Sequence, residues 1–249
     1  LFYGVIVTSV SLWCAYFIFP DATSLVFLFL ITIAAFPVMY NVLKDEEEED
    51  ERMDGADPSF FERHNKVIWV YSYLFLGVII GASFWYSVLP ASQTSVMFAQ
   101  QITTIGAIQG ATGQATYGGS FMPILLNNVK VTFIAFIMSF FFGTGALFII
   151  TWNASVIAVF LSRTAIELSH TGTSLIMGHF AAFFSIALHG IPEVVAYFIA
   201  GIAGGILSIG IIRGTHDAAI IKDAFLLFGL SVAVLVFAAA IEAFVTPVL

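Results

Sequence analysis

The chain has 249 residues, of which 60% are hydrophobic and 10% are charged, and its formal net charge is −8. No water-soluble fold has enough polar surface to cover so much apolar side chain, so composition excludes a soluble enzyme or binding domain. The acidic balance also gives no support to a nucleic-acid-binding surface. The chain is therefore expected to lie in a lipid bilayer.

Six apolar runs are long enough to cross about 30 Å of hydrocarbon as α-helices. In chain order they are residues 3–19, 25–43, 67–89, 129–152, 191–212 and 224–245. A seventh run, residues 175–188, has a length of about 21 Å as a helix, so it is either a short span or a half-helix. The predicted fold class is all-α, a polytopic transmembrane helical bundle of six to seven membrane helices with a possible broken or re-entrant helix.

Changes in composition divide the chain into three parts. Residues 1–43 are predicted to form an amino-terminal transmembrane hairpin, and residues 44–57 an acidic cytoplasmic linker, because residues 45–51 are all Asp or Glu. Such a run is either a solvated, self-repelling segment or a docking segment for a basic partner. Residues 58–249 form the main transmembrane domain. Its polar, uncharged segment at 91–122 is expected outside the membrane, as a structural cap or as a surface for a ligand or partner.

The lysine and arginine residues predict the orientation, because these residues concentrate at the cytoplasmic ends of membrane crossings. With seven crossings, seven of the eight Lys and Arg residues lie on the same side of the membrane, and Lys130 lies on the other side. We therefore predict a cell-membrane protein with a cytoplasmic amino terminus, a cytoplasmic acidic loop and an external carboxyl terminus. The residues on the predicted cytoplasmic side are Lys44, Arg52, Arg63, Lys66, Arg163, Arg213 and Lys222.

The segment His189-Gly190-Ile191-Pro192-Glu193 places two ionisable side chains and a proline in an apolar stretch. Ionisable groups at membrane depth are expensive and commonly functional. If Pro192 opens a helix, Glu193 lies in its first turn, where the helix dipole favours a carboxylate. Amide side chains lie at the two ends of the fourth crossing. A buried polar cluster is thus predicted from His189, Glu193, Asn127, Asn128 and Asn153.

Glycines four residues apart allow helix backbones to approach closely in lipid. They serve helix contacts within one chain or a contact between two copies. The pairs are Gly77/Gly81, Gly106/Gly110, Gly201/Gly205 and Gly210/Gly214, and the helix-packing candidates are Gly143, Gly145, Gly190, Gly201 and Gly205.

The order of these features resembles a known family. Asn127-Asn128 opens a crossing, Gly143-Thr144-Gly145 lies within it, Trp152-Asn153 closes it, and His189–Glu193 and Gly201–Gly205 follow. This order is similar to the stage II sporulation protein M family, also called DUF95, in its archaeal-type members, over about residues 62–247. The two amino-terminal crossings lie outside the domain usual for the family, and Ala154 stands where relatives often carry glycine.

The resemblance implies a polytopic protein that, in endospore formers, holds peptidoglycan-degrading partners at a dividing membrane. Relatives occur in archaea that make neither spores nor murein, so sporulation itself is not implied. The expected function is a non-enzymatic scaffold or assembly subunit of a membrane complex, with no catalytic residue, metal or cofactor. Its expected partners are the lipid bilayer, a second copy in a homo-oligomer (dimer) and membrane-associated proteins, but not nucleic acid.

Two other functions remain open at this point. The first is a channel or transporter with a site at the membrane midplane formed by His189 and Glu193, since such a pair could relay a proton or hold a cation. The second is an intramembrane metal-dependent enzyme. Its ligands would come from His179, His189 and Glu193, with His170 or Glu167 as a further candidate.

Overall fold

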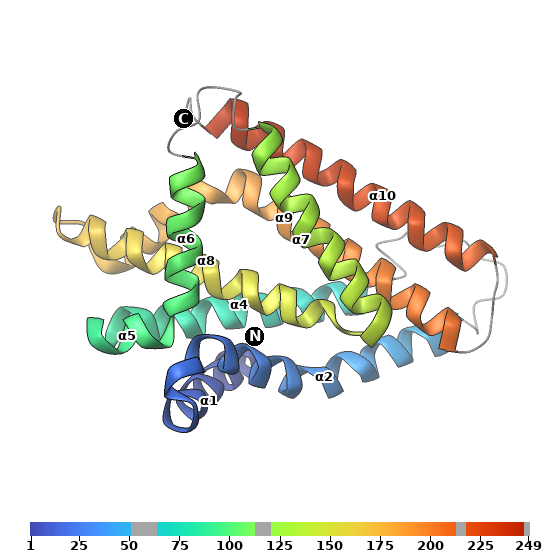
Figure 1. Ribbon diagram of the computed structural model, residues 1–249, viewed down its shortest axis with the longest axis horizontal. Helices are drawn as coiled ribbons and strands as arrows, with labels where there is room; N and C mark the ends of the chain where they lie inside the picture. Colours follow the sequence, from blue (N-terminus) through green and yellow to red (C-terminus); the bar gives the residue numbers. More distant parts are fainter. Residues whose placement is uncertain (51–63, 113–120, 213–217, 247–249) are drawn as a thin grey trace.

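The computed structural model describes residues 1–50, 64–112, 121–212 and 218–246. These residues are almost entirely helical and contain no strand (Figure 1). Six helical segments are long and apolar enough to cross a membrane, which confirms the predicted all-α polytopic bundle. The helices are α1 (Phe2–Ile18), η1 (Pro20–Ala22), α2 (Thr23–Asp50), α4 (Asn65–Val88), α5 (Ala91–Met97), α6 (Ala99–Thr112), α7 (Phe121–Phe142), α8 (Ala146–Ser169), α9 (Leu175–Ile212), α10 (Ala218–Ala240) and η2 (Ile241–Val245).

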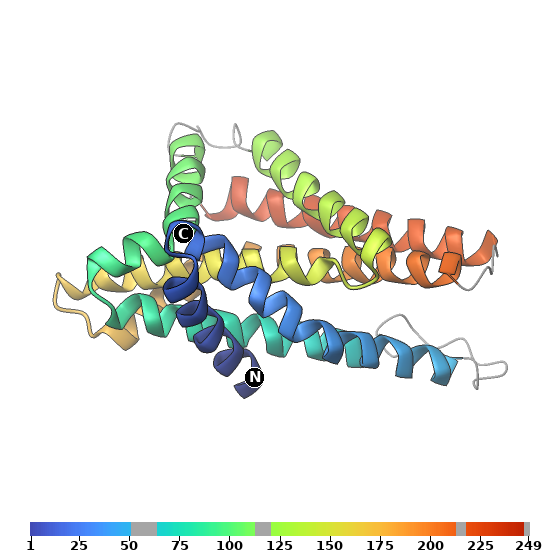
Figure 2. The ribbon, with the colours of Figure 1, turned by 60° about the horizontal axis from the view of Figure 1, so that its bottom comes forward.

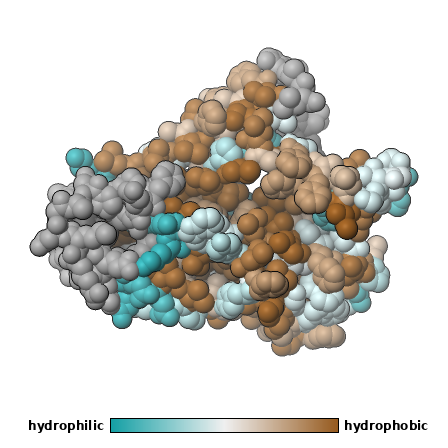
Figure 3. Space-filling model, turned by 180° about the vertical axis from the view of Figure 1, so that it is seen from behind, coloured by the Kyte–Doolittle hydropathy of each residue, from teal (hydrophilic) through white to brown (hydrophobic). Residues whose placement is uncertain are grey.

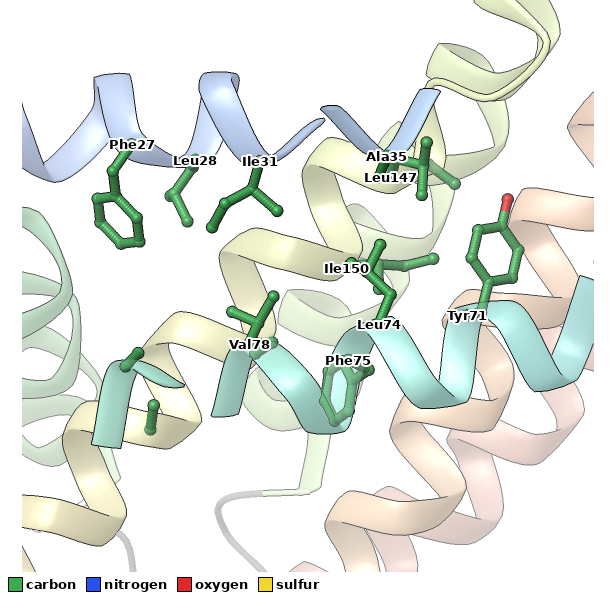
Figure 4. Packing of buried hydrophobic residues seen from close by; sticks show 14 of the residues in the cluster. Phe27, Leu28, Ile31, Ala35, Tyr71, Leu74, Phe75, Val78, Leu147 and Ile150 are labelled. Carbon is green, nitrogen blue, oxygen red and sulfur yellow. The ribbon is translucent and has the colours of Figure 1, made fainter. Parts of the chain in front are cut away.

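The long helices form two groups that share α9. Helices α1, α2, α4 and α8 surround one apolar core, to which α2 contributes Phe27 and Ile31, α4 contributes Val78, and α8 contributes Ile150 (Figure 4). Helices α7 and α10 pack on α9 and on each other, with Phe136 against Phe228 between them. Because α9 also packs along α8, it joins the two groups.

The run at 129–152 is not one crossing, because the chain reverses direction within it. Helix α7 ends at Phe142 and α8 begins at Ala146. Gly143 has a φ of 67°, which glycine adopts without steric cost. A Cβ on Gly145 would lie 2.1 Å from the carbonyl oxygen of Met138, so the turn also needs glycine there. Hydropathy misses this reversal because apolar residues flank it on both sides.

The runs at 175–188 and 191–212 are, conversely, parts of one helix. Helix α9 is continuous from Leu175 to Ile212 with Pro192 inside it, so there is neither a broken nor a re-entrant helix here. His189 and Glu193 therefore lie in the interior of a helix, and Glu193 is not at a helix amino terminus. Proline removes one backbone hydrogen bond, a loss that packed membrane helices tolerate. At 38 residues, α9 is about 57 Å long and extends beyond the hydrocarbon.

The predicted linker at 44–57 is partly helical. Helix α2 continues through the acidic residues as far as Asp50, and the rest of the predicted linker lies outside the described residues. In the predicted external segment, α5 and α6 are separate helices that meet near Phe98, and α6 runs across the long helices in both ribbon views (Figures 1 and 2).

Dividing one predicted run and joining two others leaves the predicted number of crossings unchanged. It does change the end of the bundle at which Arg163 lies. Ser83 of α4 contacts Ala158 of α8, and one turn later Ser87 and Ser162 both lie 3.4 Å from Nε2 of His179, so α4 and α8 run parallel. Arg163 consequently lies at the end of the bundle that holds α5, whereas Lys66 begins α4 at the opposite end. The prediction that Arg163 shares a side with Lys66 is therefore wrong.

Large apolar side chains cover much of the outer surface. One face of the molecule shows mostly hydrophobic residues across its middle and hydrophilic residues toward its edges (Figure 3). Phe2, Phe17, Ile176 and Phe184 are among the most exposed, each with more than 70% of its surface accessible. Such a surface is stable only against lipid or another apolar partner, since water would have to cover it otherwise.

Candidate functional site: a polar cluster between α7, α9 and α10

A hydrogen-bonded group of polar side chains links α7 to the middle of α9. Asn128 of α7 uses both ends of its amide: Nδ2 donates to Oε1 of Glu193, and Oδ1 accepts from the hydroxyl of Tyr197 at 3.1 Å. Glu193 and Tyr197 are one turn apart on α9, so their side chains meet the same amide. Asn128 and Tyr197 are buried, and Glu193 is half-buried. In a bilayer such bonds tie helices together because lipid offers the groups no other partner.

A second carboxyl group reaches this cluster from the end of α10. Glu242 lies in the five-residue π-helical turn Ile241–Val245, and its carboxyl group hydrogen bonds with that of Glu193. Such a bond requires a proton on one of the two carboxyl groups, because a carboxylate can only accept. The contact therefore holds at most one negative charge. Single π-helical turns are frequent at functional sites.

His189, one turn before Glu193 on α9, contacts the residue that follows Glu242 by one turn. Its Nδ1 is 3.4 Å from the hydroxyl oxygen of Thr246, which directly follows the π-helical turn. His189 and Thr246 are both half-buried. Asn128 lies in the third turn of α7 and Glu242 follows α10, so the cluster lies toward the end of the bundle where α7 begins. We use "carboxyl cluster" below for Asn128, His189, Glu193, Tyr197, Glu242 and Thr246.

The structure brings together three of the five polar residues predicted from sequence. Asn128, His189 and Glu193 belong to the carboxyl cluster. Asn127 is exposed on α7, and Asn153 lies on α8, where its amide donates to the carbonyl of Ile149 one turn earlier. Neither of these two residues contributes to the cluster, because Asn127 is on the outer face of α7 and α8 is not one of the cluster's three helices.

Sequence reasoning missed Tyr197, Glu242 and Thr246. Tyr197 follows Glu193 by four residues, which is the helical spacing for a shared face. Glu242 is an acidic residue inside the last apolar run, and the rule that singled out Glu193 applies to it equally. Thr246 carries no signal of its own, because a threonine at the end of a membrane helix is ordinary.

The predicted packing glycines differ in their surroundings. A Cβ on Gly201 would lie 2.6 Å from Cβ of Ala146, and one on Gly205 would lie 3.1 Å from the carbonyl oxygen of Gly143. Gly201 therefore serves contact of α9 with the start of α8, and Gly205 serves contact of α9 with the turn that precedes α8. Gly143 and Gly145 shape the turn between α7 and α8. A Cβ on Gly190 would meet nothing within 4 Å, so its side faces open space.

Other polar side chains bridge helices at separate places. His179, near the start of α9, has Nε2 at 3.4 Å from the hydroxyls of Ser87 on α4 and Ser162 on α8. Gln101 of α6 is fully buried and donates to the carbonyl of Ser24 and the hydroxyl of Ser155, both at 3.1 Å. Each of these clusters links three helices.

The described residues do not provide the ligand geometry that an intramembrane metal-dependent enzyme would need. Across residues 1–50, 64–112, 121–212 and 218–246, no three His, Cys, Asp or Glu side chains lie close enough to hold a metal ion together. His179 is ten residues before His189 on the same helix, about 15 Å along the axis. The chemistry that the described residues offer at Glu193 and Glu242 is the sharing of a proton between two carboxyl groups.

Comparison with known proteins gives one result. The family model described as Stage II sporulation protein M matches residues 23–247. The match begins at the start of α2, well before residue 62, where the sequence features placed it, so the second crossing lies inside the matched region. Neither the comparison with curated proteins nor the comparison with solved structures gave a match.

Proposed function

The chain belongs to the stage II sporulation protein M family, and from this premise we propose that it is a non-enzymatic assembly subunit of a membrane complex. In this role the bundle is a stable platform, and its outer faces hold lipid and other membrane proteins. The proposal rests on how the polar side chains inside the bundle are used.

The observation that supports the proposal is that buried and half-buried polar groups join helices at three separate places. The carboxyl cluster joins α7, α9 and the end of α10, His179 joins α4, α8 and α9, and Gln101 joins α2, α6 and α8. In ion channels, rings of backbone carbonyls or of charged side chains line the conduction path. Separate bridges are what a rigid platform needs, because each one fixes how its helices pack.

One observation favours a second candidate, a transporter for a proton or a monovalent cation. Two carboxyl groups in contact exceed what is needed to tie α9 to α10, since an amide or a hydroxyl would serve. Glu193 and Glu242 are also only half-buried. A carboxyl pair that exchanges a proton is the chemistry by which ion-coupled transporters work.

Flux through liposomes separates the two functions. We expect the purified wild-type protein, reconstituted in vesicles, to pass H⁺, Na⁺ and K⁺ no faster than protein-free vesicles under an imposed gradient. In mild detergent extracts of its native membranes, it should migrate in a complex larger than the 27.0 kDa chain. Cation flux that disappears in the Glu193→Gln/Glu242→Gln variant would establish transport instead.

The orientation follows from the charges at the two ends of the bundle. Six of the eight Lys and Arg residues lie in or beside the segments that join α2 to α4 and α9 to α10, which supports a cytoplasmic location for that end. The acidic loop is then cytoplasmic, and α5, α6 and the π-helical turn after α10 are external. Leu1 lies beside Gly77 in the middle of α4, so α1 runs from the interior of the bundle toward the external end. The plasma membrane is the proposed location.

Cysteine labelling in intact cells tests this orientation. In a Cys14→Ser background, we expect a membrane-impermeant maleimide to label Thr171→Cys, in the exposed turn between α8 and α9. It should label Lys222→Cys, exposed near the start of α10, only after the cells are permeabilised. The reverse pattern would invert the proposed topology.

A further inference from the structure

A groove opens on the outer surface of the bundle between α1, α2 and α4, and its volume is about 170 Å³. Its inner wall is buried, because Ala35, Leu74 and Leu147, which Figure 4 labels, are at most 4% exposed. Val38 and Tyr73 at its rim are 40% and 48% exposed, so the groove is open on its outer side. We use "α1/α2/α4 groove" below for Leu1, Tyr3, Gly4, Ala35, Val38, Val70, Tyr73, Leu74 and Leu147.

The lining of the α1/α2/α4 groove suits an apolar occupant. It carries no charged side chain, and its only polar side-chain groups are the hydroxyls of Tyr3 and Tyr73. The hydroxyl of Tyr3 donates to the carbonyl of Ala34. A water molecule held inside a protein needs several polar partners, whereas an apolar cavity of about 150 Å³ binds a molecule such as benzene. The groove therefore fits part of a hydrocarbon chain better than it fits water.

Exposed aromatic rings place the groove just inside one membrane–water interface. Trp69 stacks on Tyr73 of α4 with ring centroids 5.4 Å apart, and Phe36 stacks on Tyr40 of α2 with centroids 6.1 Å apart. All four rings are exposed on the outer surface. Tryptophan and tyrosine are enriched where lipid headgroups meet hydrocarbon. Both pairs lie toward the end of α2 and the start of α4, so the groove opens into the leaflet on the proposed cytoplasmic side.

Charges of both signs lie beyond the groove, on the helix faces that line it. Lys66 is one turn before Val70 on α4, about 6 Å along the helix axis. Asp45 is two turns after Val38 on α2, about 10 Å along that axis. Both charged side chains are exposed. A cation near the groove and an anion farther from it match the phosphate and the terminal amine of a zwitterionic phospholipid, in their order from the acyl chains.

From this arrangement we propose that the α1/α2/α4 groove binds one acyl chain of a zwitterionic phospholipid, with its phosphate at Lys66 and its amine toward Asp45. The chain fills the space between α1 and the pair formed by α2 and α4, so the lipid helps to hold α1 in the bundle. A headgroup with a net negative charge is disfavoured, because the acidic residues at 45–50 follow on α2. The inference goes beyond the proposed assembly function and does not depend on it.

Native mass spectrometry of the purified chain measures this binding. Phosphatidylethanolamine is added to the protein in detergent at increasing concentration, and the fraction of protein that carries one lipid is recorded. We expect Val38→Phe, which places a ring at the rim of the groove, to lower the apparent affinity for the first lipid about fivefold. Val236→Phe makes the same change at a similarly exposed position of α10 and should leave this affinity unchanged.

Two further comparisons test the headgroup. Lys66→Gln should lower the apparent affinity for phosphatidylethanolamine about threefold. Lys222→Gln, which removes another exposed lysine near the start of α10, should leave it unchanged. Phosphatidylglycerol, which has the phosphate but no amine, should bind to the wild type more weakly than phosphatidylethanolamine does.

Each possible result supports or overturns the proposal. Equal lipid affinities of Val38→Phe and Val236→Phe would overturn the acyl-chain site, and phosphatidylglycerol that binds as tightly as phosphatidylethanolamine would overturn the headgroup. If Val38→Phe abolishes a dimer without weakening lipid binding, a second copy of the chain occupies the groove instead. Helical circular dichroism of Val38→Phe equal to that of the wild type ensures that lost binding is not lost folding.

Discussion

Replacing Asn128 by leucine is expected to lower the free energy of unfolding by about 1–3 kcal/mol. Leucine has a similar volume but no hydrogen-bonding group. The change removes the N–H group that donates to the Glu193 carboxyl and the oxygen that accepts from the hydroxyl of Tyr197, a residue that is only 4% exposed. Both groups would then stay inside the protein without the partner they have in the wild type. Unfolding in mixed micelles with increasing dodecyl sulfate measures the change.

The neighbouring amide provides a matched control. Asn127→Leu makes the same chemical change one position earlier, but Asn127 is exposed and takes no part in the cluster. Its effect should be within about 0.5 kcal/mol of zero. Equal effects of the two substitutions would contradict the described hydrogen bonds.

A second change separates lost bonding from lost packing. Tyr197→Phe removes the hydroxyl that needs Asn128, so part of the cost of Asn128→Leu should disappear when the two changes are combined. If the costs simply add, the bond between Tyr197 and Asn128 contributes nothing to stability.

Gly204→Ala is expected to produce the other large loss, also about 1–3 kcal/mol. A Cβ on Gly204 would lie 2.2 Å from the carbonyl oxygen of Phe136 and 3.0 Å from the backbone nitrogen of Phe140. These are backbone atoms of α7, so no side-chain rotation can relieve the overlap. Helices α7 and α9 must separate, which weakens the contact that also positions Asn128 beside Glu193.

Gly229→Ala in α10 is the control for the change from glycine to alanine itself. A Cβ there meets nothing within 4 Å, and alanine favours helix over glycine by up to about 1 kcal/mol. This variant should be as stable as the wild type or more stable in the same titration. A loss equal to that of Gly204→Ala would show that close packing of α7 on α9 is not the cause.

For the candidate site, sequence reasoning identified the helix but not the full set of partners. Ionisable residues in an apolar run are visible without a structure, which is how His189 and Glu193 were found. Asn128 and Asn127 are indistinguishable in sequence, because which face of α7 meets α9 depends on packing. Glu242 is also an ionisable residue in an apolar run, so the same rule identifies it. Its contact with Glu193, however, depends on the antiparallel packing of α10 on α9.

Membrane residence and helical class were determined by the sequence alone, because apolar length and the scarcity of charge fix what a bilayer accepts. Where helices begin and end was decided by tertiary structure at two places. The Gly143 turn divides one apolar run, and α9 passes through Pro192 and unites two. Both outcomes depend on neighbouring helices, because α9 packs against the turn at Gly143 and α8 packs against both halves of α9, at Gly178 and at Gly201. Hydropathy records how a residue partitions into lipid, whereas these packing contacts determine the direction in which the chain crosses it.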